Sequence, residues 1–153
     1  NQALCNPDSL YIGSEIFEHG IISATSYIKE HNLRNILIWP DDVDVILRDM
    51  PNDYLFNIFI LFPDPWTKRK HCKRRFLQDW RIKIMLDKLQ KGRNIYFASD
   101  IADYIAFVQD VCQKLGVSYI ISEDPLHLNY QNTRYHNKAL LEGRRVQFMA
   151  ITK

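Results

Sequence analysis

Short apolar stretches alternate with helix-length amphipathic stretches along most of this 153-residue chain. The alternation constrains the fold strongly, because strand–helix repeats build α/β proteins whose sheets are mainly parallel. The pattern predicts strands over residues 10–14, 35–39, 57–62, 94–98, 117–121 and 144–152, and helices over residues 17–31, 43–48, 73–90 and 101–115. The last strand partly alternates, which suits an antiparallel edge, and the stretch before it is a polar connection. We expect one domain over residues 1–153, a length sufficient for a single core.

Acidic residues stand at or just after four of the predicted strands: Glu15, Asp42, Asp64 and Asp100. Parallel sheets bind ligands beyond the carboxyl ends of their strands, so we expect the four carboxylates to meet at one rim. N-capping of the following helices is the alternative explanation for each of them. Glu15 suits ribose hydroxyls, and Asp42 suits an exocyclic amino group, with Asp41 as a competing candidate.

Asp64 lies between two prolines in the run Phe62–Trp66 (FPDPW). Each proline restricts its own φ angle and the residue before it, so the backbone of Asp64 has little freedom. An ionised carboxylate accepts hydrogen bonds only, and guanine presents N1–H and N2–H₂ side by side. Asp64 is therefore a candidate for accepting both of these hydrogen bonds from a guanine. The alternative is a rigid turn with a solvated carboxylate.

A dense basic run follows this turn. It contains Lys68, Arg69, Lys70, Lys73, Arg74 and Arg75, with His71 and Cys72 among them. The net charge of the chain is only +2, so the positive charge is local. Lys and Arg side chains contact phosphates, and Trp66 offers a surface on which an unstacked base can lie. We predict a nucleic acid as the partner of this run rather than solvent alone, with Arg134, Lys138, Arg144 and Arg145 extending the patch.

Composition argues against several classes of protein. The three cysteines are far apart and form no CxxC pair, which argues against a disulfide framework or a cysteine-rich zinc site. No apolar run is long enough to span a membrane, and no signal peptide opens the chain. We therefore expect a cytoplasmic protein without a metal ion. The five glycines are too dispersed to form a phosphate-binding loop, which disfavours a dinucleotide oxidoreductase.

The FPDPW run, Lys68 and the His71–Arg75 run together resemble the signature of bacterial tRNA (guanine-N7-)-methyltransferases. Other segments resemble this family in the same order along the chain. They are residues 6–8 (NPD), 13–15 (GSE), 35–42, 98–100 (ASD), 133–135 (TRY) and 141–145 (LEGRR). The resemblance implies a Rossmann-like, class I fold and methyl transfer from S-adenosylmethionine to N7 of the guanine at position 46, in the variable loop of tRNA.

Roles for individual residues follow from the resemblance. Glu15 and Asp42 would contact the cofactor, and Asp64 would be catalytic, where cofactor and guanine meet. Lys68 and Asp100 would bind the substrate, and four further residues would complete the guanine pocket: Thr133, Arg134, Tyr135 and His136. The segment that would contact the RNA backbone comprises Lys70, His71, Cys72, Lys73, Arg74 and Arg75.

The chain departs from the family pattern at two places. His136 stands where the family has Glu, and a neutral His offers one acceptor and one donor in place of a carboxylate. The first strand of the family and its glycine-rich turn should precede Asn6 and are absent. Because the downstream motifs are complete, we expect this sequence to be a piece of a longer protein.

Two other functions remain open on the sequence alone. One is a non-catalytic RNA-binding module derived from this fold, and the other is a methyltransferase with a different substrate. The sequence does not distinguish a monomer from a homodimer.

Overall fold

The computed structural model describes residues 2–127 and 129–153. The chain forms two compact units, which are described separately below. The first comprises Asn1–Met50 and Asn129–Gln131, and the second comprises Pro51–Leu128 and Asn132–Lys153. The expectation of a single domain stays a prediction.

The first unit contains a two-stranded parallel sheet of β1 (Tyr11–Ser14) and β2 (Ile36–Trp39). Helix α2 (Glu18–Glu30) connects the two strands, and α1 (Gln2–Cys5) and α3 (Val43–Asp49) lie at either end of the segment. The side chain of Asn35 donates hydrogen bonds to the carbonyls of Ala3, Asn6 and Ser9. This amide therefore holds the N-terminal segment beside the start of β2.

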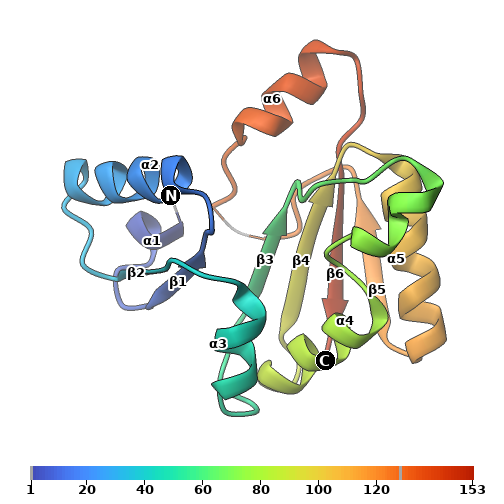
Figure 1. Cartoon of the computed structure of the whole chain (residues 1–153), viewed down its shortest axis with the longest axis horizontal. Helices are drawn as coiled ribbons and strands as arrows, with labels where there is room; N and C mark the ends of the chain where they lie inside the picture. The colour runs from blue at the N-terminus through green and yellow to red at the C-terminus, as the bar shows by residue number, and fades with distance from the viewer. Residues whose placement is uncertain (1, 128) are drawn as a thin grey trace. The chain divides into compact units, whose positions relative to one another are not determined.

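The second unit is built on a four-stranded sheet in the order β3-β4-β6-β5 (Figure 1). Its strands are β3 (Ile58–Leu61), β4 (Asn94–Ser99), β5 (Ser118–Ser122) and β6 (Gln147–Thr152). Strands β3 and β4 are parallel, and β6 runs antiparallel to both of its neighbours. Helix α5 (Ala102–Leu115) packs against β4, β5 and β6, and α4 (Asp79–Lys88) packs against α5. The remaining elements are η1, a 3₁₀-helix (Arg69–Arg74), and α6 (Arg134–Leu141).

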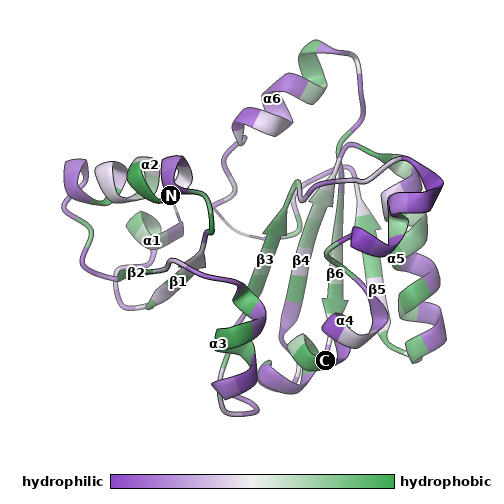
Figure 2. Ribbon diagram, in the orientation of Figure 1, coloured by the Kyte–Doolittle hydropathy of each residue, from purple (hydrophilic) through white to green (hydrophobic). Residues whose placement is uncertain are grey.

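The core of the second unit lies between this sheet and its helices. Figure 2 shows hydrophobic residues along the strands and a mixture of hydrophobic and hydrophilic residues along α5. Phe97 on β4 is buried against Tyr104 of α5, with ring centroids 5.1 Å apart. Four consecutive residues of β6, 148–151, are also buried. A strand buried on both faces occupies the middle of a sheet, which explains the continuous apolar run.

Three sequence predictions about secondary structure are corrected. The final strand is antiparallel, as expected, but it is central, and β5 forms the edge. The helix predicted over residues 73–90 begins only at Asp79. The side chain of Gln78 donates to the carbonyls of Cys72 and Arg75, and these bonds stabilise a turn there. The segment before β6, expected to be a polar connection, contains the short helix α6.

Among the described residues, no helix has the length and apolar character needed to cross a membrane.

Candidate functional site

The turn that carries Asp64 has an unusual backbone. Phe62 and Trp66, on either side of Pro63-Asp64-Pro65, have φ angles of 54° and 41°. Residues other than glycine rarely adopt this left-handed region, and each such residue costs about 1–3 kcal/mol. The backbone N–H of Phe62 donates to the carbonyl of Ala98 at 2.8 Å, which continues the pairing of β3 with β4. The surrounding structure therefore imposes this turn, and the turn places Asp64 beyond the end of β3.

A cavity of about 260 Å³ opens at this end of the second unit. Its walls come from the turn after β3, the end of β4, helix α6 and the segment before β6. The lining residues are Phe62, Pro63, Asp64, Pro65, Asp100, Ile101, Tyr135, Lys138 and Arg144. The expectation that Asp64 and Asp100 meet at the carboxyl ends of neighbouring parallel strands is thus met within this unit.

The two carboxylates of the cavity have different surroundings. Asp64 is exposed, whereas the side chain of Asp100 is only 16% exposed and accepts a hydrogen bond from Nε of Arg144 at 2.7 Å. Arg144 also forms an ion pair with Glu142. Arg144 therefore holds the carboxylate of Asp100 in place and brings a positive charge to the cavity wall, so the cavity can take a ligand that presents both donors and acceptors.

Aromatic rings form another part of the cavity wall. The rings of Phe62 and Tyr135 are nearly parallel, with an interplanar angle of 21° and centroids 6.3 Å apart. Tyr135 is half exposed, and Arg134 lies over its ring at 5.4 Å. Planar bases stack on such rings. A flat heterocycle whose edge meets Asp64 or Asp100 would suit this wall.

The other predicted residues of α6 have structural roles. Thr133 is the N-cap of the helix, since its hydroxyl accepts from the backbone N–H of His136 at 3.1 Å. The ring of His136 is buried and lies near Phe62 and Phe148, at 6.1 and 5.9 Å. Burial lowers the pKa of His136, so it is neutral at pH 7. Among the described residues, Thr133, Arg134 and His136 do not line the cavity, and their part in a guanine pocket stays a prediction.

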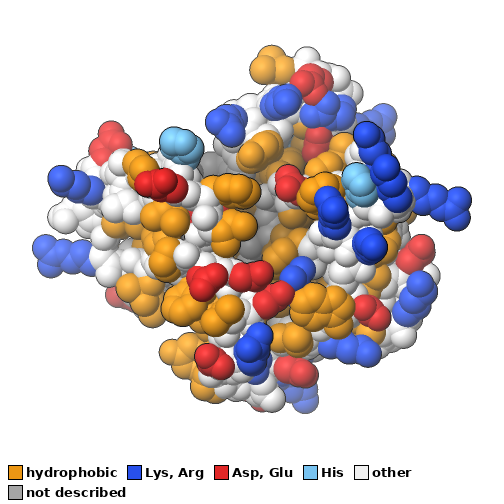
Figure 3. All heavy atoms as spheres, viewed as in Figure 1, with side chains coloured by type: hydrophobic (Ala, Val, Ile, Leu, Met, Phe, Trp, Pro, Cys, Tyr) orange, Lys and Arg blue, Asp and Glu red, His pale blue; other side chains and the backbone are white. Residues whose placement is uncertain are grey.

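The basic run forms the segment Lys68–Arg74, which includes η1. Figure 3 shows Lys and Arg side chains gathered over this segment, the green one that follows β3 in Figure 1. The exposed cations are Lys68, Arg69, Lys70, Lys73 and Arg74. The guanidinium of Arg74 lies 5.0 Å from the ring centroid of Trp66, and the ring of His71 meets Trp66 edge-on. Trp66 is thus partly covered by the segment that we predict to meet RNA. Cys72 is half-buried, and its thiol contacts the carbonyls of Trp66 and Lys68.

The burial of Arg75 differs from the sequence prediction of a continuous RNA-binding run. Its side chain is 2% exposed and lies inside the protein, under the turn that carries Asp64. Its guanidinium donates to the carbonyl of Pro65 and forms an ion pair with Asp103. A buried guanidinium with these partners does not reach a phosphate.

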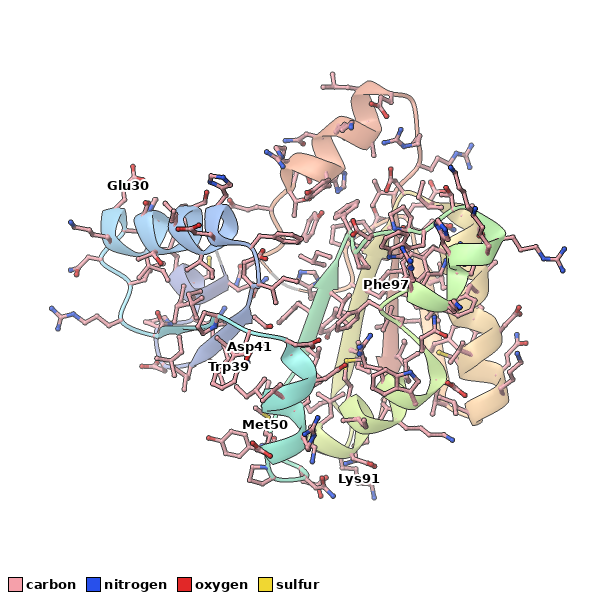
Figure 4. All side chains as sticks on the ribbon, viewed as in Figure 1. Glu30, Trp39, Asp41, Met50, Lys91 and Phe97 are labelled. Carbon is pink, nitrogen blue, oxygen red and sulfur yellow. The ribbon has the colours of Figure 1, made fainter. Side chains whose placement is uncertain are left out.

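Glu15 and Asp42, the predicted cofactor ligands, lie in the first unit, after the paired ends of β1 and β2. Figure 4 labels the neighbouring Trp39 and Asp41. Asp42 caps α3 by accepting from the backbone N–H of Asp44, and Glu15 accepts from that of Phe17. The meeting of all four carboxylates stays a prediction, because the other two belong to the second unit.

Gly20 leaves room for the carboxylate of Glu15. A Cβ atom added to Gly20 would lie 2.7 Å from Oε2 of Glu15, so the absence of a side chain at Gly20 allows the carboxylate to lie over the start of α2. The bond to Phe17 uses Oε1. Capping and ligand binding are compatible, because a carboxylate has about four acceptor sites. Asp41 accepts from the N–H of Asp42, so the choice between these two aspartates stays open.

Sequence reasoning missed much of the cavity wall. The sequence gives Phe62 no role beyond its place in the FPDPW run, and it predicts Lys138 and Arg144 only as extensions of the basic patch. Their proximity to Asp100 depends on α6 and on the central position of β6. Among the described residues, no group of three or more His, Cys, Asp and Glu side chains is placed to hold a metal ion.

The fold matches those of solved methyltransferases. A crystal structure of a methyltransferase from Pyrococcus furiosus aligns with 98% of this chain and 68% of its own, with a TM-score of 0.64 and 13% identity. The sheet with its antiparallel β6 is thus that of a Rossmann-like fold.

Sequence comparison is more specific. A family model described as "Putative methyltransferase" matches residues 1–149. A tRNA (guanine-N(7)-)-methyltransferase of Wolbachia pipientis is 33% identical over 99% of this chain and 67% of its own. The chain belongs to the tRNA (guanine-N7-)-methyltransferase family.

A bifunctional methyltransferase of Rickettsia typhi is 41% identical over 99% of this chain. The chain spans 30% of the length of that protein.

Proposed function

We propose that this chain forms part of an S-adenosylmethionine-dependent tRNA (guanine-N7-)-methyltransferase that acts on the guanine at position 46. One observation carries the proposal: Asp64 and Asp100 line a cavity that also contains the parallel rings of Phe62 and Tyr135. The segment Lys68–Arg74 follows the same turn along the chain and carries five exposed cations. Membership of the family supports this assignment.

The cavity offers guanine two kinds of contact. Phe62 and Tyr135 provide a surface on which the purine ring can stack. Stacking does not distinguish one base from another. Asp64 or Asp100 accepts hydrogen bonds from N1–H and N2–H₂ of the base, a pair of donors that adenine lacks at these positions. Lys138 and Arg144 provide donors for the O6 edge or for a phosphate. Together these contacts favour guanine over adenine.

S-Adenosylmethionine, when bound, supplies a methyl group on a sulfonium sulfur. We propose that Glu15 accepts hydrogen bonds from the ribose hydroxyls and Asp42 from the adenine amino group. Asp64 would orient the guanine. The carboxylates at the ends of β1 and β2 suit these donors.

Methyl transfer to N7 requires no general base from the protein. N7 carries a lone pair and no proton. S-Adenosylmethionine would supply the methyl group: the C–N7 bond would form as the methyl–sulfur bond breaks, the bonding electrons would stay on sulfur, and the positive charge would pass to guanine. Asp64 contributes by alignment and by placing a negative charge near the purine. Phosphates of the tRNA would contact Lys68–Arg74 and hold the molecule while the base enters the cavity.

The partner under this proposal is tRNA. A cytoplasmic location and a monomeric or homodimeric state stay predictions.

Methyl incorporation into tRNA that lacks the modification tests the proposal, using the full-length protein to which this chain belongs. We expect Asp64→Ala to lower kcat/KM by about 100-fold or more, because alignment and charge stabilisation are both lost. Asp110→Ala is the matched control, since Asp110 is an exposed aspartate on α5 and does not line the cavity. Equal turnover of the two variants would remove Asp64 from the mechanism. A wild-type protein that binds tRNA without binding S-adenosylmethionine would instead be the non-catalytic RNA-binding module.

A further inference from the structure

We propose that Arg75 is a positioning residue that sets the spacing of Asp64 and Asp100, and this role rests on the proposed function. Sequence alone placed Arg75 in the RNA-binding run, as the last of six consecutive residues. The structure separates it from its neighbours, since Arg74 is exposed and Arg75 is buried. Its contacts are all within the protein, and they join the two segments that supply the carboxylates of the cavity.

The first segment that Arg75 holds is the strained turn. The φ angles of Phe62 and Trp66 are both positive, so the turn needs restraint at both ends. At the β3 end, the N–H of Phe62 bonds to Ala98. Pro63 and Pro65 have no N–H to contribute to such a bond. On the far side of Asp64, Nε of Arg75 donates to the carbonyl of Pro65 at 2.9 Å.

The second segment is the start of α5, just after Asp100. Nη1 of Arg75 donates to the backbone carbonyl of Asp103 at 3.3 Å, and Nη2 forms the ion pair with its carboxylate. Pro65 follows Asp64 by one residue, and Asp103 follows Asp100 by three. One rigid guanidinium therefore links the backbones that carry the two carboxylates.

Aromatic rings keep the guanidinium in this orientation. Its central carbon lies 4.9 Å from the ring centroid of Tyr104 and 5.1 Å from that of Phe107. Tyr104 is itself fixed, because it is buried and its hydroxyl accepts from the backbone N–H of Leu77 at 3.2 Å. A lysine at position 75 would keep the charge, but it lacks the planar fork that bonds Pro65 and Asp103 together and stacks on two rings.

The first test follows the turn without any substrate. Trp66 ends the turn, and replacing Trp39 and Trp80 by Phe leaves it as the sole tryptophan of this chain. The measurement uses the full-length protein. In that protein Trp39 and Trp80 are replaced, and any tryptophan outside this chain is replaced as well. We expect Arg75→Lys to raise the acrylamide quenching constant of Trp66 about twofold or more, because the Pro65 carbonyl loses its restraint. The matched control is Arg48→Lys, the same substitution at an exposed arginine on α3, which should leave the constant within about 20% of the parent value. An unchanged constant in Arg75→Lys would overturn the inference.

The second test separates positioning from RNA binding in the otherwise unmodified full-length protein. At saturating tRNA, we expect Arg75→Lys to lower the single-turnover methylation rate by about 10- to 100-fold, with the Kd for tRNA within threefold of wild type. The matched control, Arg48→Lys at an exposed arginine on α3, should retain the rate. A normal rate in Arg75→Lys with a weakened Kd would show that Arg75 contacts RNA and would refute the proposal.

A third variant tests the positioning role of Arg75 if Arg75→Lys does not fold. Asp103→Asn removes the ionic partner on the exposed side of Arg75 and keeps the backbone carbonyl. We expect the methylation rate of this variant to fall about two- to fivefold at unchanged Kd, and an unchanged rate would count against the inference. If the wild-type protein fails to methylate tRNA while Arg75→Lys still loosens Trp66, the proposed function is wrong and the positioning role stands.

Discussion

At the level of single residues, Arg144 shows how an ion pair can shape a binding site. Its Nε bonds to Asp100, whose side chain is largely buried, so removing the arginine leaves a carboxylate in the wall without its partner. We expect Arg144→Met to lower kcat/KM for methyl transfer by about tenfold or more. Methyl incorporation by the full-length protein measures this effect.

The neighbouring residue provides the control for that prediction. Arg145 is 84% exposed and lies 3.4 Å from Glu123 at the surface, where ion pairs contribute little. Arg145→Met should therefore change kcat/KM by less than about twofold. Equal losses in both variants would mean that a general loss of positive charge, and not the bond to Asp100, explains the result.

His136 makes a second prediction at this level, on the pH dependence of stability. Burial lowers the pKa of His136 in the folded state, so the unfolded chain takes up its proton at higher pH. The contribution of His136 to stability is therefore present above the ordinary pKa of about 6.5 and is lost as the pH falls below it. We expect the melting temperature to decrease from pH 7 to pH 5, and His136→Phe should reduce that decrease.

His127 contributes to the same pH dependence of the melting temperature. Burial also lowers the pKa of His127, so part of the pH dependence should survive in His136→Phe. An identical decrease in the variant and the wild type would show that His136 does not contribute.

At the level of elements, β6 lies in the middle of the sheet and β5 lies at its edge, so side chains of β6 contribute more to the core. Phe148 on β6 is buried, whereas Ile120 on the edge strand β5 is 60% exposed. We expect Phe148→Ala to lower the free energy of unfolding by about 3–5 kcal/mol and Ile120→Ala by less than about 1 kcal/mol. Urea unfolding measures both. Similar losses would contradict the central placement of β6.

Helix α6 allows a test of what Thr133 does. Its hydroxyl caps the helix that carries Tyr135 and Lys138 to the cavity wall. Because Asn is also a good N-cap, Thr133→Asn should retain activity, whereas Thr133→Val should lose about fivefold in kcat/KM, equivalent to about 1 kcal/mol. Methyl incorporation distinguishes helix capping from direct contact with guanine. If the Thr133 hydroxyl contacted guanine directly, neither Asn nor Val would replace it.

At the level of the whole molecule, the distribution of charge matters more than the net charge of +2. We expect Lys73→Ala combined with Arg74→Ala to weaken tRNA binding and to reduce the slope of log K against log salt by roughly one to two. Both side chains are exposed beside the cavity turn. Titrations of tRNA at several salt concentrations measure the slope.

A control with the same change in net charge is available at the other end of the sheet. Lys91 and Lys114 are exposed and precede the amino ends of β4 and β5. Replacing both by Ala should leave the salt slope within about 0.5 of the wild-type value. A similar reduction in both double variants would mean that the tRNA responds to total charge, and the assignment of Lys68–Arg74 would fail.

The amino-acid sequence by itself determined the strand–helix alternation, the acids at the strand ends and the family. These features depend on local periodicity, on the conformational limits of proline and on the order of short motifs, all of which can be read along the chain. The sequence also predicted the meeting of Asp64 and Asp100, because parallel neighbours bring their carboxyl ends to one edge.

Only the tertiary structure decided which members of the basic run face solvent. Arg74 and Arg75 have the same side chain and adjacent positions, and they differ only because Pro65, Asp103 and two rings surround the second. The same holds for α6 and for the middle position of β6, which depend on contacts between residues far apart in sequence. The free energy that selects these arrangements comes from burial and from satisfied hydrogen bonds, and neither is visible until the chain has folded.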